Sequence, residues 1–440
     1  MPDYRTLWRW HFYAGLFCIP FVAVLALTGS VYLFKPQLEA FADRDVRTLS
    51  LSGQATSATA QVAAALQAVP GARVTAYELP WTPASAARVH VVRAQGAKAI
   101  VYVHPESLAV LKVIDPDTRV AEFVKDIHGE LLLGRTGAIL VELAACWAIV
   151  MVITGLCLWW PRGASGLAGV LYPRLHRGSR VLWRDVHAVT GVWVSGLALF
   201  LLLTGLPWTT VWGGAFKAVR SLGSPVAIKQ DWHTGHEGEQ AAHQHAMGTA
   251  LADGAEAAAA TPIGYDAVVG QLLPLHLASP VLVQPPRKAG APWVVKAESQ
   301  NRPERVELRF DAVTGNRSYL ERFEDRPVVD RVVGIGVAAH EGQLFGLFNQ
   351  LLGVVTALGL LTLCGSAVVM WWRRRPDGVL GAPPVPAVPA PVGRALVVLI
   401  CVLGVLLPLL GAALVAVALL EHLVLRSRRG LRSWLGLRAV

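Results

Sequence analysis

The sequence predicts a mainly α-helical polytopic membrane protein that is built from a tandem repeat. Of its 440 residues, 54% are hydrophobic and 16% are charged, which is too apolar for a soluble protein of this length. A run of about 20 apolar residues is long enough to cross the hydrocarbon core of a bilayer. Such runs cover residues 7–34, 137–160, 186–212, 345–372 and 395–420.

The repeat is visible in two fixed spacings. His128 lies 31 positions before Trp159 (159 − 128), and His340 lies 31 positions before Trp371 (371 − 340). An offset of 176 positions relates the first apolar run to the third. The related features are His11, Gly15 and Thr28-Gly29 in the first run, and His187, Gly191 and Thr204-Gly205 in the third. A unit made of a span, an external domain and a second span therefore occurs twice.

The two external segments have the periodicity of small α+β domains. In the first, a helix is predicted over 57–68 and strands over 73–79, 88–93, 99–103 and 108–114. In the second, a helix is predicted over 265–273 and strands over 280–283, 293–297, 305–310 and 318–321. We therefore expect two external domains, each with an antiparallel sheet and a helix.

The predicted order of segments follows from these runs. It is a span over 7–34, an external domain over 36–125, a span over 126–162, a cytoplasmic loop over 163–183, a span over 184–212, a second external domain over 214–338 with a His-rich loop over 231–250, a span over 340–373, a Pro-rich cytoplasmic linker over 374–394, and a C-terminal apolar segment over 395–425.

The topology of the C-terminal segment is left open by the sequence. It is interrupted by Pro408 and followed by arginines, among them Arg426 and Arg432. A single crossing would leave these arginines outside, whereas a helical hairpin that turns at Pro408 would return them to the cytoplasm.

Arginines near the helix ends predict the orientation. Arg5 and Arg9 precede the first span, and Arg373, Arg374 and Arg375 follow the fourth. The positive-inside rule places these ends and the N-terminus in the cytoplasm, and the external domains in the periplasm of a bacterial inner membrane. The net charge of +10 is explained in the same way, so we expect the lipid bilayer as a partner and no nucleic acid.

Four histidines at two depths are the candidate cofactor ligands. His11 and His187 lie near the cytoplasmic side, and His128 and His340 near the external side. Facing imidazoles on helices are suitable axial ligands for haem iron, and ionisable residues in a membrane usually have a function. Nearby glycines would give the ring room by removing side chains, and they are Gly15, Gly191, Gly134 and Gly346. We predict two haem b groups, non-covalent because no Cys-x-x-Cys-His motif is present. The alternatives are histidines bonded to headgroups or carbonyls, and a pairing of His11 with His128.

Other polar residues allow more than one reading. Arg135 and Arg331 are candidate contacts of the haem propionates, although arginines here also reach toward headgroups. Glu142, inside the second span, fits proton movement, a bond to a cofactor or a contact between helices. A weak metal site in the mobile loop is a further candidate, formed by His233, His236, His243 and His245.

The electron donor is predicted to be outside this chain. The sequence has no P-loop, Rossmann or flavin domain, and its cytoplasmic segments are too short to hold one. The five cysteines all lie in apolar runs, so no disulfide framework is expected either. Electrons would therefore come from membrane quinol or from a separate reductase.

Several motifs resemble one family of membrane proteins. They are Trp8-Arg9-Trp10-His11 with Thr28-Gly29, His128-Gly-Glu-Leu-Leu-Leu-Gly, Trp159-Trp160-Pro161-Arg162 and Trp371-Trp372-Arg373-Arg374-Arg375-Pro376. Together they resemble the PepSY-associated transmembrane helix family, which includes PiuB-like iron-regulated proteins and FoxB-like siderophore reductases. The resemblance implies PepSY-like external domains and an oxidoreductase, a haem-dependent ferric-siderophore reductase whose substrate is a ferric siderophore in the periplasm.

Two other functions are compatible with the family. One is a non-enzymatic anchor whose PepSY-like domains bind peptides or regulate a partner. The other is a siderophore or metal permease, which would need polar or broken helices at the midplane of the membrane. The matched histidines favour the electron-transfer function, because an anchor has no need of them.

Overall fold

A computed structural model describes residues 4–161, 166–222, 263–385 and 394–437. The chain divides into two compact units, each of which collects segments from both repeats. The membrane unit comprises Met1–Ser30, Asp126–Glu237 and Leu351–Val440, and the sheet unit comprises Val31–Lys125 and Gly238–Gln350. The His-rich loop predicted over 231–250, with His233, His236, His243 and His245, lies outside the described residues.

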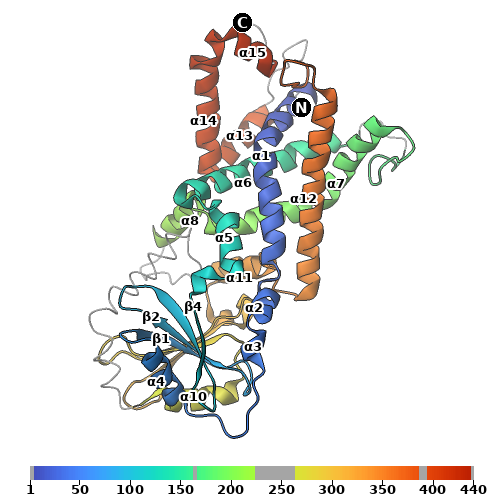
Figure 1. Ribbon diagram of the computed structural model, residues 1–440. Helices are drawn as coiled ribbons and strands as arrows, with labels where there is room; N and C mark the ends of the chain where they lie inside the picture. Colours follow the sequence, from blue (N-terminus) through green and yellow to red (C-terminus); the bar gives the residue numbers. More distant parts are fainter. Residues whose placement is uncertain (1–3, 162–165, 223–262, 386–393, 438–440) are drawn as a thin grey trace. The chain divides into compact units, whose positions relative to one another are not determined.

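Five helices in the described part of the chain are long and apolar enough to cross a membrane (Figure 1). They are α1 (Tyr4–Tyr32), α6 (Gly134–Trp159), α7 (Ser179–Gly205), α12 (Leu347–Arg374) and α14 (Pro408–Leu423). They match the five apolar runs, although α14 takes up only the second half of the last run. The predicted fold class, a polytopic helical membrane protein with an α+β part, is confirmed.

The second and fourth spans begin later than the sequence suggested. His128 lies on a separate helix, α5 (Val120–Glu130), and His340 ends another one, α11 (Val328–His340). The backbone is left-handed at Gly134 and Gly346, with φ of 55° and 59°, and each glycine marks the start of the following span. The predicted span 126–162 is therefore the end of a short helix, a turn and a long helix, and the predicted span 340–373 is a turn and a long helix.

The C-terminal segment is a helical hairpin. Helix α13 (Arg394–Leu406) packs against α14 so closely that a Cβ added to Gly411 would lie 2.6 Å from the carbonyl oxygen of Gly404. The residues before and after the hairpin also lie together, because the Leu380 amide donates to the Trp434 carbonyl at 2.9 Å. Of the two topologies left open by the sequence, the structure adopts the hairpin.

The tail after the hairpin, which includes α15 (Arg429–Leu435), is attached to the start of α1. The Arg9 guanidinium donates to the carbonyl oxygens of Gly436, at 2.9 Å, and Pro383, and the Tyr13 hydroxyl donates to the Leu435 carbonyl at 2.6 Å. Arg9 was predicted only as a topology signal, but it is 9% exposed and holds the tail.

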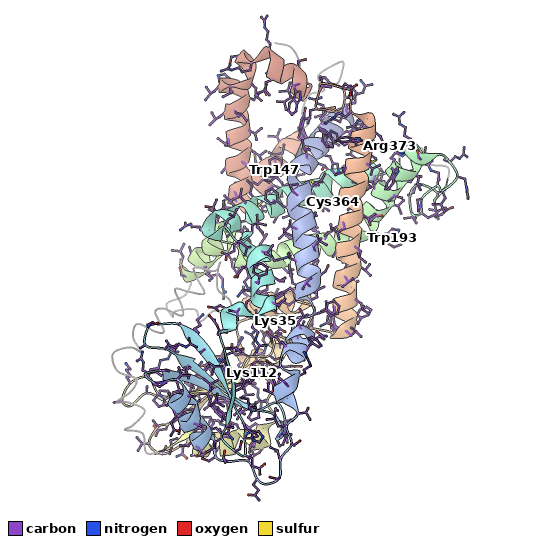
Figure 2. The ribbon with its side chains drawn as sticks, viewed as in Figure 1. Lys35, Lys112, Trp147, Trp193, Cys364 and Arg373 are labelled. Carbon is purple, nitrogen blue, oxygen red and sulfur yellow. The ribbon has the colours of Figure 1, made fainter. Side chains whose placement is uncertain are left out.

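Tryptophans at the ends of the spans bind the adjacent loops. The Trp159 indole donates to the Val170 carbonyl at 3.0 Å, and Trp371, its counterpart in the second repeat, donates to Leu380 at 2.8 Å. Trp193, labelled in Figure 2, donates to the Leu171 carbonyl at 3.0 Å. These indoles therefore order the loops beside the spans.

Among its described residues, the sheet unit contains one eight-stranded antiparallel sheet, in the order β4-β3-β2-β1-β5-β6-β7-β8. The strands are β1 (Arg73–Glu78), β2 (Ala87–Val92), β3 (Lys98–Val103), β4 (Val110–Ile114), β5 (Val281–Gln284), β6 (Trp293–Ala297), β7 (Val306–Phe310) and β8 (Arg317–Arg322). All eight correspond to predicted strands. The two predicted domains nevertheless share one sheet, because β1 and β5 pair where Tyr77 faces Val283.

One face of the sheet forms the core with two helices. They are α4 (Ala58–Ala68) and α10 (Tyr265–Leu272), and each comes from a different repeat. Fully buried valines of the strands pack against both helices, among them Val89, Val101 and Val283. Since α4 and α10 also contact one another, the core is continuous across the two repeats.

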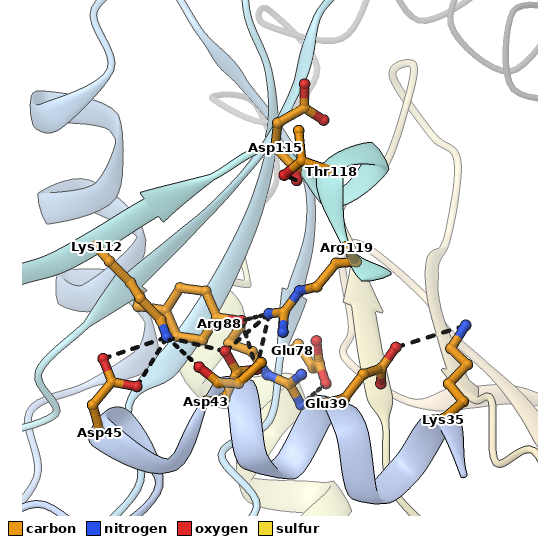
Figure 3. Close-up of polar contacts among 12 residues, drawn as sticks. Lys35, Glu39, Asp43, Asp45, Glu78, Arg88, Lys112, Asp115, Thr118 and Arg119 are labelled. Carbon is orange, nitrogen blue, oxygen red and sulfur yellow. Dashed lines mark hydrogen bonds and ion pairs between the residues drawn. The ribbon is translucent and has the colours of Figure 1, made fainter. Parts of the chain in front are cut away.

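An ionic network around Asp43 joins the short helices after α1 to the sheet (Figure 3). Asp43 lies between α2 (Lys35–Ala42) and α3 (Arg44–Arg47), and it accepts bonds from Arg119 at 2.9 Å and from Lys112 at 3.0 Å. The Tyr102 hydroxyl donates to the same carboxylate at 2.9 Å. Burial alone would raise the pKa of Asp43, but the bonds from Arg119 and Lys112 keep this pKa below its ordinary value.

Candidate functional site

His11 and His187 face each other in the membrane unit. His11 lies on α1 and His187 on α7, and their ring centroids are 6.3 Å apart with the ring planes at 84°. Both side chains are partly buried among the helices. The structure therefore brings together the cytoplasmic pair that the offset of 176 positions predicted, and His11 does not pair with His128.

Each of these rings is bonded to a hydroxyl on a neighbouring span. The Nδ1 atom of His11 lies 3.0 Å from the Thr154 hydroxyl of α6, and the Nδ1 atom of His187 lies 3.0 Å from the Ser366 hydroxyl of α12. Both hydroxyl residues are buried. The hydroxyls make no bond to the other nitrogen of each ring, Nε2.

A glycine next to Thr154 makes room for the ring of His11. A Cβ added to Gly155, which follows Thr154, would lie 3.2 Å from Cε1 of His11. We expected Gly15 and Gly191 to provide this room, but a Cβ there would meet Met151 and Leu363 instead. The glycine that makes room for His11 therefore lies on the facing helix, α6.

His128 is held in the same manner at the other end of α1. Its Nδ1 atom lies 3.0 Å from the Thr28 hydroxyl, and a Cβ added to Gly29 would lie 3.1 Å from its Cε1 atom. Thr28 and Gly29 thus contact His128 in the same way as Thr154 and Gly155 contact His11. His340 belongs to the sheet unit, where it is the last residue of α11.

The separation of His11 and His187 fits two axial ligands of one iron. A metal–imidazole bond of about 2 Å, with about 1 Å from the nitrogen to the ring centre, puts the two centroids about 6 Å apart. The measured 6.3 Å agrees with this value. No group of three or more His, Cys, Asp or Glu in the described part of the chain is arranged to hold a metal ion. Haem iron needs only two ligands from the protein, so the pair fits haem better than a bare metal ion.

A family model described as the PepSY-associated TM region matches residues 8–374. The chain belongs to this family. The match extends from near the start of α1 to the end of α12, so it includes both facing histidines and both hydroxyls; residues 1–7 and 375–440, which contain the C-terminal hairpin, lie outside it. No curated protein matches the chain.

Within this PepSY-associated TM region, Glu142 makes a contact between helices. Its side chain is fully buried on α6, and its two carboxylate oxygens accept from the backbone amides of Val211 at 2.8 Å and Trp212 at 2.9 Å. These amides lie in the first turn of α8 (Val211–Leu222), where backbone N–H groups have no acceptor within the helix. Of the roles considered for Glu142, the structure provides the interhelical contact.

The two candidate propionate contacts occupy different positions. Arg135 is exposed in the first turn of α6. Arg331 is half-buried on α11, and its Nε atom is buried without a hydrogen-bond partner among the described residues. Both arginines stay predictions for this role.

Thr154 and Ser366 are the functional residues that the sequence reasoning missed. Each lies 26 positions after the external histidine of its repeat (154 − 128 and 366 − 340). The spacing that related His128 to His340 therefore contained the signal. It was overlooked because a hydroxyl in a span can be satisfied by its own helix.

Proposed function

We propose that this protein carries electrons across the membrane through two b-type haems. His11 and His187 would be the axial ligands of one haem, and His128 and His340 those of the other. The observation that supports this most is the facing pair of His11 and His187, at 6.3 Å and with both Nδ1 atoms already bonded. The second haem rests on the matched spacing of His128 and His340 in the two repeats.

The protein side of this function is to hold imidazoles in an apolar environment. The apolar helices α1, α6, α7 and α12 carry the pair and its hydroxyl partners, and the hydroxyls of Thr154 and Ser366 orient the rings. When bound, haem would supply a one-electron couple whose potential depends on its axial ligands and surroundings. No proton needs to move for such a transfer, which agrees with the structural role of Glu142.

The proposed acceptor is ferric siderophore iron in the periplasm. Each ferric ion takes one electron and leaves as ferrous iron, for which siderophores have lower affinity. This part rests on the resemblance of the motifs to the siderophore-reductase branch of the family. The proposed donor is membrane quinol or a separate reductase, and the arginine-rich helix ends support an N-terminus in the cytoplasm.

Haem content tests the proposal directly. We expect the purified protein to hold about two b-type haems per chain by the pyridine-haemochrome method, and His11→Ala and His187→Ala each to lose one of them. His422→Ala is the matched control, since His422 is an exposed histidine on the membrane helix α14. Unchanged haem content in His11→Ala and His187→Ala would refute the ligand assignment.

The acceptor is tested separately. Dithionite-reduced protein, freed of excess dithionite, should be reoxidised by a ferric siderophore, with ferrous iron trapped by a ferrous chelator. A protein that holds haem but is not reoxidised by any ferric siderophore would keep the electron-transfer function and remove this acceptor. A protein without haem, after expression with sufficient haem supply, would favour the anchor or regulator instead.

A further inference from the structure

We propose that Thr154 and Ser366 are positioning residues that fix the tautomer of His11 and His187. In this tautomer Nδ1 carries the proton and Nε2 carries the lone pair. The effect of this tautomer on iron binding rests on the proposed haem between the two rings. The tautomer itself does not depend on that proposal.

The argument begins with the single proton of each hydroxyl. The Thr154 hydroxyl donates to the carbonyl oxygen of Val150 at 2.8 Å, and a carbonyl can only accept. With the hydroxyl proton on this carbonyl, the bond between the hydroxyl and Nδ1 of His11 uses the proton of the ring. A neutral imidazole has one N–H group, so Nε2 is left as the unprotonated nitrogen that a metal can bind.

The second repeat shows the same arrangement with a different residue. The Ser366 hydroxyl donates to the carbonyl of Leu363 at 3.1 Å and lies 3.0 Å from Nδ1 of His187. The two sites are built independently, since each bond joins helices of one repeat. A shared geometry with threonine in one site and serine in the other shows that the hydroxyl is the common requirement.

A third instance occurs at His128. The Thr28 hydroxyl donates to the Val24 carbonyl at 2.8 Å and lies 3.0 Å from Nδ1 of His128. Buried hydroxyls in these spans are not always paired with histidine. Thr356, fully buried on α12, donates to the Leu352 carbonyl at 2.8 Å and makes no hydrogen bond to a histidine ring among the described residues, so it is a matched control.

The hydroxyls also affect how strongly the rings would bind iron. A hydrogen bond from the distal N–H of a histidine raises its basicity, and loss of such a partner typically costs about 10–100-fold in metal affinity. A more basic ligand favours ferric over ferrous iron. Loss of the bond should therefore raise the midpoint potential, by about 59 mV for each tenfold change in that preference.

The first experiment determines the tautomer in haem-free full-length protein. In ¹⁵N-histidine-labelled protein, the signals of His11 and His187 are assigned by comparison with His11→Gln and His187→Gln. We expect both rings in the Nδ1–H form, and Thr154→Val and Ser366→Ala each to populate the Nε2–H form of its own ring. Thr356→Val should leave both rings unchanged, and Thr154→Ser should restore the tautomer of His11.

The second experiment measures potentials in haem-loaded protein. Thr154→Val and Ser366→Ala should raise the midpoint potential of the haem held by His11 and His187, and Thr154→Ser should restore it. Rings in the Nε2–H form in the wild type, or potentials that change equally in Thr356→Val, would overturn the proposal. A wild type that binds no haem would overturn the proposed function, while the tautomer measurement would still decide the role of the hydroxyls.

Discussion

Replacement of Glu142 tests how the membrane unit is held together. Its carboxylate accepts from two amides, at 2.8 Å and 2.9 Å, that begin α8 and lie beyond the end of α7. The bend between α7 and α8 is therefore attached to the middle of α6. Trp212 continues the attachment, because its indole donates to the Leu406 carbonyl of the C-terminal hairpin at 2.9 Å.

The magnitude follows from the two amides. A buried donor without an acceptor costs about 1–3 kcal/mol, so Glu142→Leu, which fills the space but accepts no bond, should cost about 2–6 kcal/mol. The surrounding lipid offers no substitute acceptor, so we expect the upper half of this range. Glu142→Gln keeps one acceptor oxygen and directs an NH₂ group at the other amide, so its cost should lie between that of the wild type and that of Glu142→Leu.

Unfolding in detergent, followed by tryptophan fluorescence, measures these costs. Glu324→Gln is the control, because Glu324 and its partner Arg322 are both exposed, and such a surface contact is worth at most about 1 kcal/mol. Equal stability of wild type and Glu142→Leu would refute the reasoning. Retained stability combined with lost electron transfer would instead return Glu142 to a role in proton movement.

Three further predictions concern other contacts. Burial alone would raise the pKa of Glu122, but the charges of Lys35 and Lys125 lower this pKa from 4.5 to about 2. The resulting stabilisation, at most about 3 kcal/mol, is present above pH 4.5 and lost as the pH falls from 4.5 toward 2, and acid unfolding of Glu122→Gln should lack this loss. Gly155→Ala should lower haem occupancy without lowering the unfolding midpoint, because alanine favours the helix while its Cβ presses on His11. Its control is Gly365→Ala, which should keep the haem because the added Cβ meets open space. Gly411→Val should separate α13 from α14, and increased proteolysis after α12 would report it.

The sequence predicted the elements of the sheet unit but not their assembly. All eight strands follow from alternating apolar residues and turn residues, which are local signals. The pairing of β1 with β5 joins Tyr77 to Val283, positions about two hundred residues apart. Two four-stranded sheets and one eight-stranded sheet have the same local pattern, so the sequence alone did not distinguish them.

The start of the second span was misjudged for a different reason. Leu131 and Leu132 have φ of 53° and 58°, a left-handed conformation that leucine rarely adopts. Because leucine so rarely breaks a helix in this way, the apolar sequence around these residues predicted a continuous helix. The glycine at position 134 was read as room for a cofactor, although its positive φ shows that it serves the turn.

The candidate site shows why the duplication matters for function. The bond from His11 to Thr154 lies within the first repeat, and the bond from His187 to Ser366 lies within the second. At this site the approach of the two rings joins the repeats, just as the β1–β5 pair joins them in the sheet unit. A single repeat can orient one imidazole but cannot supply two axial ligands at this depth. The duplication thus creates the pair that would hold iron, because each repeat supplies half of the site already oriented.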